Sequence, residues 1–114
     1  MNVTGFADLA AHEVKRAVIS SSANPVVAVA AVVGKKIRVI SYALSNGHAA
    51  TTAPVKFQSA STDLTGAMQI LAGNTLFGQD NPNGHVETVA GEALNIVNSA
   101  TLALGGYVNY VELG

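Results

Sequence analysis

The sequence predicts an all-β fold, an eight-stranded antiparallel β-sandwich of jelly-roll-like topology. Short runs with alternating apolar and polar residues recur along the chain, and turn-forming Gly, Pro, Asn and Asp residues separate them. No stretch in the body of the chain has a long helical period. About eight short strands in roughly 100 residues are typical of two packed antiparallel sheets.

Residues 1–11 are predicted to form an N-terminal arm, and residues 12–114 a single β-sandwich domain. Phe6 and Leu9 lie at a helical spacing, so we expect the arm to be extended or partly helical. If its eleven residues were fully extended, they would span up to about 36 Å. An arm of that length could reach a neighbouring subunit.

The first strand is predicted over residues 13–20. It would place Val14, Arg16 and Val18 on one side, because side chains alternate along a strand. The Ser-rich residues 20–25 then have the composition of a turn, so the first strand is expected to end there.

The second predicted strand, residues 26–33, is rich in Val, which favours extended structure. Residues 34–35 combine Gly and Lys and indicate a turn. We therefore expect residues 26–33 to pair with residues 36–44 as a hairpin.

Residues 36–44 are the longest uninterrupted strand-like run and are predicted to be the central strand. The apolar residues divide between two faces, one with Ile37 and Val39 and the other with Ile40, Tyr42 and Leu44. Because both faces are mostly apolar, both are expected to be covered. The first face would lie in the core of the monomer, and the second against the other sheet or a neighbouring subunit.

The remaining strands are predicted over residues 54–60, 67–72, 75–79, 85–89, 93–98 and 102–113. Phe57 is expected to anchor the core, while Lys56 and Gln58 face water. Gly105 and Gly106 interrupt the last strand, which indicates a β-bulge or a place where another backbone comes close.

The composition indicates a protein that associates with other proteins. Only 11% of the 114 residues are charged, the hydrophobic fraction is 49%, and the net charge is −1. A typical protein carries about 25% charged residues. So small a charge on a small domain favours oligomer formation or docking on a larger assembly.

The same composition argues against several classes of partner. Six basic residues are too few and too scattered to follow a nucleic acid backbone. No apolar run approaches the roughly 18 residues needed to cross a membrane, and the N-terminus does not read as a signal peptide. The chain has no cysteine. We therefore expect neither a nucleic acid nor a membrane partner.

No catalytic, cofactor-binding or metal-binding residues are predicted. His12, His48 and His85 do not pair at a metal-ligand spacing, and no serine lies in a nucleophile elbow, so we expect no enzyme. A small cupin-like enzyme would need these three histidines together. Tyrosines can stack on sugars, but they are expected to pack in the sandwich with their hydroxyls at its rim; these are Tyr42, Tyr107 and Tyr110.

An ordered set of short motifs suggests a family. The set comprises KIRVISY at residues 36–42, VKFQS at 55–59, TDLTG at 62–66, GHVET at 84–88, GEALNI at 91–96 and GGYVNY at 105–110. It resembles the jelly-roll cement, or capsid decoration, proteins and head-fibre-type modules of tailed bacteriophages. His85 and Val86 depart from the family, in which an aromatic pair is commoner there.

The resemblance implies a virion structural protein with no catalytic residues. Such a protein binds the major capsid protein on the outer surface of the head, commonly as a homotrimer. The alternative is a phage tail or head-fibre module that binds a host receptor or glycan. The predicted oligomer or capsid contacts are Arg38, Ile40, Tyr42, Tyr107 and Tyr110.

Overall fold

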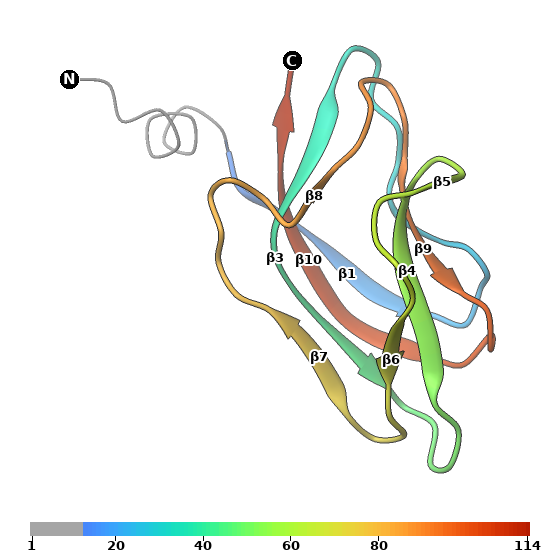
Figure 1. Ribbon diagram of the computed structural model, residues 1–114. Coiled ribbons are helices and arrows are strands. Elements are labelled where there is room, and N and C mark those ends of the chain that lie inside the picture. The colour runs from blue at the N-terminus through green and yellow to red at the C-terminus, as the bar shows by residue number, and fades with distance from the viewer. Residues whose placement is uncertain (1–12) are drawn as a thin grey trace.

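The computed structural model describes residues 13–114, so the predicted arm at residues 1–11 lies outside the described part. The described chain is all-β, and its two antiparallel sheets form a sandwich-like arrangement (Figure 1). Sheet A has the order β1 (Lys15–Ser21), β10 (Leu104–Leu113), β3 (Lys36–Asn46) and β7 (Thr75–Gly78), and β8 (Val86–Glu87) also pairs with β3. Sheet B has the order β2 (Val26–Val29), β9 (Leu94–Asn98), β4 (Ala53–Ser59) and β5 (Thr62–Asp63), and β6 (Met68–Ile70) also pairs with β4.

The strand pairs are nested along the chain. β1 pairs with β10, β2 pairs with β9, and β3 pairs with β7 and β8. β4 pairs with the strands that follow it, β5 and β6. The first half of the chain therefore runs back along the second half, as in one long hairpin folded over itself.

The all-β prediction is confirmed, but the count of eight strands is wrong, since residues 13–114 contain ten. β5 lies between the strands predicted over residues 54–60 and 67–72, and it has only two residues, as does β8. A two-residue strand is too short to show any alternation of apolar and polar side chains. Its existence depends on a neighbouring strand edge, which the local sequence does not reveal.

The predicted hairpin between residues 26–33 and 36–44 is also wrong. β2 ends at Val29 and belongs to sheet B, whereas β3 belongs to sheet A. Residues 30–35 connect the two sheets. Both strands carry apolar side chains into the same core, so they lie on opposite sides of it instead of pairing edge to edge.

A β-bulge at Ile40 divides the central strand β3. Asn109 pairs with Ser41 and the next residue, Tyr110, pairs with Val39, so Ile40 is an extra residue in β3. An extra residue switches the face to which all later side chains point. The prediction that the apolar residues of this strand divide between two faces is therefore wrong. The core contains Ile37, Val39, Tyr42 and Leu44.

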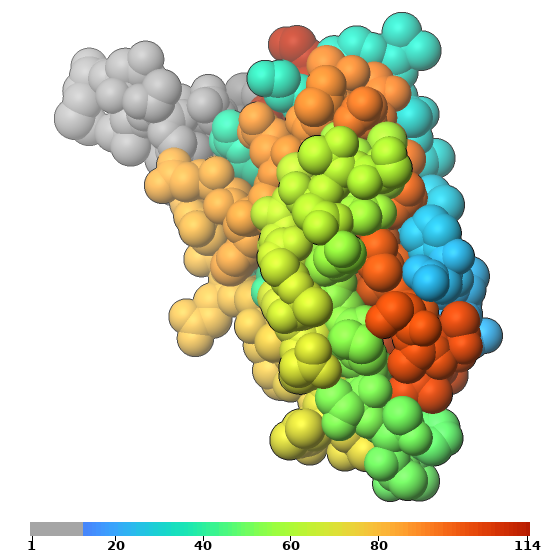
Figure 2. Space-filling model, turned by 45° about the vertical axis from the view of Figure 1, so that its right-hand side comes forward, coloured from blue at the N-terminus to red at the C-terminus, as the bar shows by residue number. Residues whose placement is uncertain are grey.

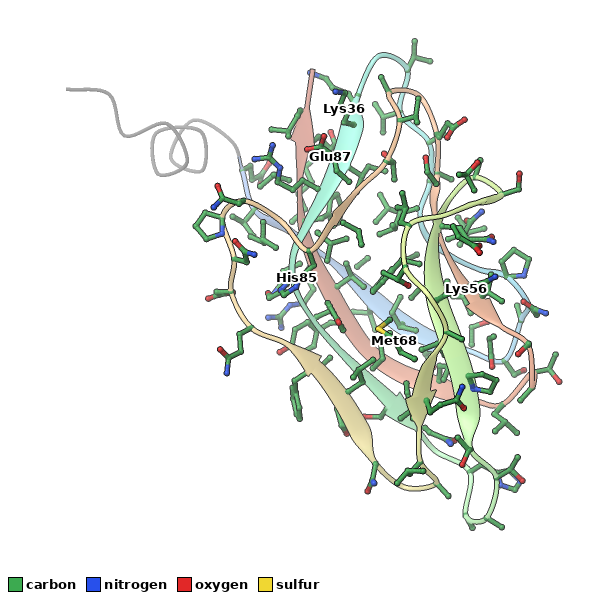
Figure 3. The ribbon with its side chains drawn as sticks, in the orientation of Figure 1. Lys36, Lys56, Met68, His85 and Glu87 are labelled. Carbon is green, nitrogen blue, oxygen red and sulfur yellow. The ribbon has the colours of Figure 1, made fainter. Side chains whose placement is uncertain are left out.

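The centre of the core confirms the predicted anchor. The side chain of Phe57 is only 1% exposed, and its ring meets that of Tyr42 edge to face, with centroids 5.1 Å apart. From β9, which corresponds to the strand predicted over residues 93–98, Leu94 and Ile96 are fully buried in the same cluster. Met68, from β6, packs against this cluster, whereas Lys56 extends outward from β4 (Figure 3).

At Gly106 the backbone of β10 lies close to that of β3. The φ of 125° at this glycine is one that residues with side chains rarely adopt. A Cβ atom there would overlap the carbonyl oxygen of Ala43 on β3. The predicted close backbone approach is therefore confirmed, while the bulge of sheet A lies further along, opposite Asn109 and Tyr110.

Candidate functional site

An apolar row crosses the outer face of sheet A. Val18 on β1 is opposite Tyr107 on β10, Tyr107 is opposite Ala43 on β3, and Ala43 is opposite Phe77 on β7. Val18 and Phe77 are exposed, Phe77 to 69%. The small Ala43 side chain stands between two aromatic ones, so the row is low in its middle.

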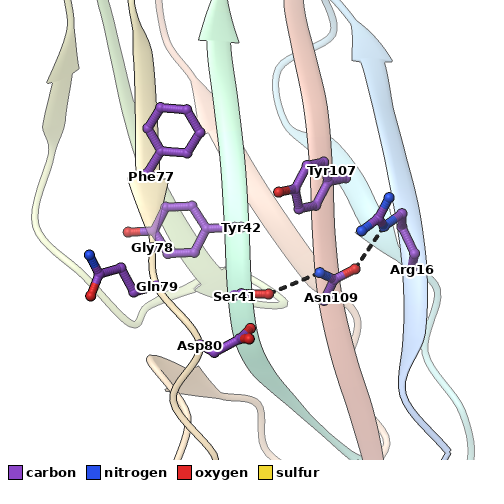
Figure 4. Close-up of a pocket in the computed structure, with 9 residues that line it drawn as sticks. All are labelled: Arg16, Ser41, Tyr42, Phe77, Gly78, Gln79, Asp80, Tyr107 and Asn109. Carbon is purple, nitrogen blue, oxygen red and sulfur yellow. Dashed lines mark hydrogen bonds between the residues drawn. The ribbon is translucent and has the colours of Figure 1, made fainter.

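A polar row runs beside the apolar one. Arg16 on β1 donates from Nε to the Asn109 side-chain oxygen at 2.9 Å. The Asn109 amide in turn donates to the Ser41 hydroxyl at 2.9 Å (Figure 4). The Arg16 guanidinium also lies 4.2 Å from the centre of the Tyr107 ring, a cation–π contact that fixes both side chains.

The two rows enclose a hollow, which we call the trough. It has a cavity volume of about 630 Å³ and is bounded on the β7 side by Phe77, Gly78, Gln79 and Asp80 (Figure 4). The loop after β7 is held against the bulge, because the Asn81 amide donates to the Ile40 carbonyl at 2.8 Å. The bulge thus places Gln79 and Asp80 beside the outer face.

Tyr42 reaches the trough from the core side of the sheet. A Cβ atom on Gly78 would overlap the Tyr42 ring, so glycine lets the ring pass the edge strand β7. The ring also meets His85 edge to face, with centroids 5.3 Å apart. Burial raises the pKa of the Tyr42 phenol above its ordinary value.

Tyr42→Phe should make the protein less sensitive to alkaline pH. Because the pKa of Tyr42 is raised in the folded state, the neutral phenol contributes stability below its ordinary pKa of about 10, and this is lost as pH rises. We expect the free energy of unfolding to fall less in Tyr42→Phe than in wild type between neutral pH and about pH 11. Urea denaturation at both pH values measures this, and an equal fall in the two proteins would contradict it.

The outer face of sheet B is different in character. Asp63 accepts hydrogen bonds from Lys56 at 2.9 Å and from Gln58 at 2.7 Å. Both bonds hold the pKa of the exposed Asp63 carboxyl below its ordinary value, the Gln58 bond having the larger effect. Asn95, which pairs with Gln58 on this face, keeps a buried Oδ1 atom without a hydrogen-bond partner. The outer face of sheet A carries the trough and is therefore the stronger candidate for binding.

A second exposed feature is the end of the sandwich near Lys36. Two loops meet there, and their exposed apolar residues, Ala31, Val32, Val33, Val89 and Ala90, form what we call the apolar end. The Gly91 amide donates to the Lys35 carbonyl at 2.9 Å and joins the loops, which lie side by side at the top of Figure 2.

The charged side chains beside the apolar end form ion pairs within the chain. Glu87 lies 2.9 Å from the Arg38 Nε and 4.0 Å from the Lys36 Nζ (Figure 3). Arg38 also donates to the Pro82 carbonyl at 3.4 Å. Val33, which at 96% is the most exposed large apolar side chain of residues 13–114, lies next to these ion pairs.

The predicted contact residues do not form one cluster. Tyr42 and Tyr107 line the trough, whereas Arg38 is paired with Glu87 near the apolar end. Ile40 is buried at the bulge, and Tyr110 packs against the core. Sequence reasoning did not single out Phe77 or Asn109, although the predicted alternation of β10 places Asn109 on the same face as Tyr107.

Among residues 13–114, no group of three or more potential metal ligands is close enough to hold an ion. His12 lies outside this part of the chain. His48 accepts hydrogen bonds at Nδ1 from the amides of Ala50 and Thr51, and His85 contacts the Gln79 carbonyl. No helix in the described residues is long and apolar enough to span a membrane.

Comparison with known proteins identifies no relative: no family model, no curated protein and no solved structure matches the chain.

Proposed function

We propose that the protein is a jelly-roll decoration protein of a tailed-phage virion. It would bind the major capsid protein on the outer surface of the head as a homotrimer and act without catalysis. The nested strand pairs support the jelly roll, in which the chain folds back on itself into two Greek-key sheets. The order of the sequence motifs and the low charge support the assembly role.

The apolar end is the single observation that best supports docking on a protein lattice. Val33 projects almost fully exposed from a turn that backbone hydrogen bonds hold in place. A rigid apolar side chain enters a partner's pocket with little loss of conformational entropy. Arg38 and Lys36 both face Glu87, so this carboxylate balances one of the two positive charges beside the apolar end.

Many such contacts would act together on a capsid. Each apolar end needs only modest affinity, because subunits joined in a trimer raise one another's effective concentration at the lattice. The expected effect is that the head resists internal pressure through many identical weak contacts.

Val33→Asp should weaken binding to expanded heads at least tenfold without changing the trimer. An exposed valine becomes a charge that must be desolvated in the partner's apolar pocket. Co-sedimentation with heads built from the cognate coat protein measures binding, and light scattering measures the mass of the free protein.

Leu71→Asp is the matched control. Leu71 is 58% exposed and follows β6 near Asn46, at the other end of β3 from Lys36. This variant should bind heads as wild type does. A wild-type protein that is monomeric and has no affinity for heads would refute the proposed function, whereas equal weakening by both variants would refute the docking role of the apolar end.

A further inference from the structure

We propose that the trough on the outer face of sheet A binds a neutral saccharide. A sugar ring would lie over Ser41, between Phe77 and Tyr107. This inference goes beyond the proposed function and does not depend on it, because it uses only side chains of the trough.

The shape of the trough fits one ring. Phe77 and Tyr107 stand on β7 and β10, on either side of β3, and both are in register with Ala43. Two strand spacings of about 4.8 Å separate β7 from β10. Between the two aromatic walls, the trough is lined by Ser41, Tyr42 and Gly78.

The walls and the floor have different chemistry. The aromatic faces of Phe77 and Tyr107 match the C–H faces of a pyranose, which are apolar. The floor and the far rim carry donors and acceptors for hydroxyl groups, from Asn109, Gln79 and Asp80. An apolar cleft with a few convergent polar groups is the usual composition of a small-ligand site.

The Asn109 amide is held in place before any ligand arrives. Its oxygen accepts from Arg16 and its nitrogen donates to Ser41, each at 2.9 Å, which fixes the orientation of the amide group. One N–H and one oxygen lone pair remain for a ligand. A preorganised polar group loses little entropy on binding, so it can discriminate between hydroxyl configurations.

The charge in the trough favours a neutral ligand. Arg16 and Asp80 contribute opposite charges to the lining, so the site has no net charge. The Arg16 guanidinium is also engaged by Tyr107 and Asn109. An acidic sugar or a phosphate would meet the Asp80 carboxylate, whereas a neutral sugar can donate two hydroxyls to it.

A second copy of the chain is the competing occupant of this face. The apolar row favours such a contact at Val18, which is exposed at the β1 side. The hollow itself favours a small ligand, because a flat subunit surface would bury Asp80 and Gln79 without filling the space between the walls.

The test uses the full chain and a defined set of sugars. Oligosaccharides of glucose, galactose, N-acetylglucosamine and rhamnose are titrated, with sialyllactose as the acidic probe, and binding is measured by ligand-observed NMR and calorimetry. We expect at least one neutral series to bind and sialyllactose to bind at least tenfold more weakly. Phe77→Ala and Asp80→Asn should each weaken the neutral sugar at least tenfold.

Val27→Ala is the control, since Val27 is exposed on β2 in sheet B, away from the trough. It should bind the sugar as wild type does. Absence of binding to every neutral series, or unchanged affinity in Phe77→Ala, would overturn the proposal. So would a change from oligomer to monomer in Phe77→Asp, which would assign the face to a subunit contact. None of these results depends on head binding, so they leave the proposed function untouched.

Discussion

Phe57→Ala is expected to lower the free energy of unfolding by about 3–5 kcal/mol. Phe57 is 1% exposed between the two sheets, and its ring packs edge to face against Tyr42. Alanine would remove most of this buried apolar surface and leave a cavity that the rigid sheets on both sides cannot close. Urea or guanidinium denaturation, followed by fluorescence or circular dichroism, measures the change in the free energy of unfolding.

Phe77→Ala is the matched control for this experiment. It removes the same side chain from a position that is 69% exposed on the outer face of sheet A. Its effect should stay within about 0.5 kcal/mol. A loss below about 1 kcal/mol in Phe57→Ala would mean that the ring does not anchor the core.

Gly106→Ala should destabilise the protein by at least about 3 kcal/mol or prevent folding. The residue combines a φ of 125° with a position at which a Cβ atom would overlap the Ala43 carbonyl oxygen. That oxygen belongs to the backbone of β3, so relief requires β10 and β3 to separate in the middle of sheet A. Denaturation measures the loss, and the yield of folded protein is the readout if the variant does not fold.

Gly105→Ala changes the neighbouring glycine and should be nearly neutral. A Cβ atom there meets nothing within 4 Å, and its φ is not in the left-handed region. We expect a change within about 0.5 kcal/mol. If the two alanine variants had equal stability, the close approach of β10 to β3 at Gly106 would be refuted.

The sequence predicted those parts of the fold that depend on neighbouring residues. The strand predicted over residues 93–98 is present as β9, and its alternating apolar residues Leu94 and Ile96 are buried. Phe57 was identified in the same way. The partner of each strand depends on residues far along the chain, which explains why the hairpin of β2 with β3 was predicted wrongly.

The bulge at Ile40 had no local signal. β3 has apolar residues both before and after Ile40. This sequence pattern fits a regular strand with two apolar faces, and it fits equally well a bulged strand with one apolar face. Only the pairing of Asn109 with Ser41 and of Tyr110 with Val39 distinguishes them. For this reason Tyr42 was placed on the face opposite to Val39.

The candidate site was predicted only in part. Tyr107 and Tyr42 were predicted as oligomer or capsid contacts, with packing in the sandwich expected over sugar stacking, and both line the trough. Phe77 and Asp80 come from another segment. The pairing of β7 with β3 places Phe77, and the hydrogen bond from the Asn81 amide to the Ile40 carbonyl holds the loop that contains Asp80. A site assembled from four strands leaves no motif in any one of them.

The nested pairing of strands also constrains how the chain folds. β4 and β5 are neighbours in sequence, and the Phe57 amide donates a hydrogen bond to the Thr65 hydroxyl, only 8 residues away. The outermost pair, β1 and β10, is joined by a bond between Lys15 and Glu112 that spans 97 residues. Closing so long a loop costs more entropy than closing a short one. Folding is therefore favoured to start at the innermost turn and spread outward, so that the two ends of the described chain come together last.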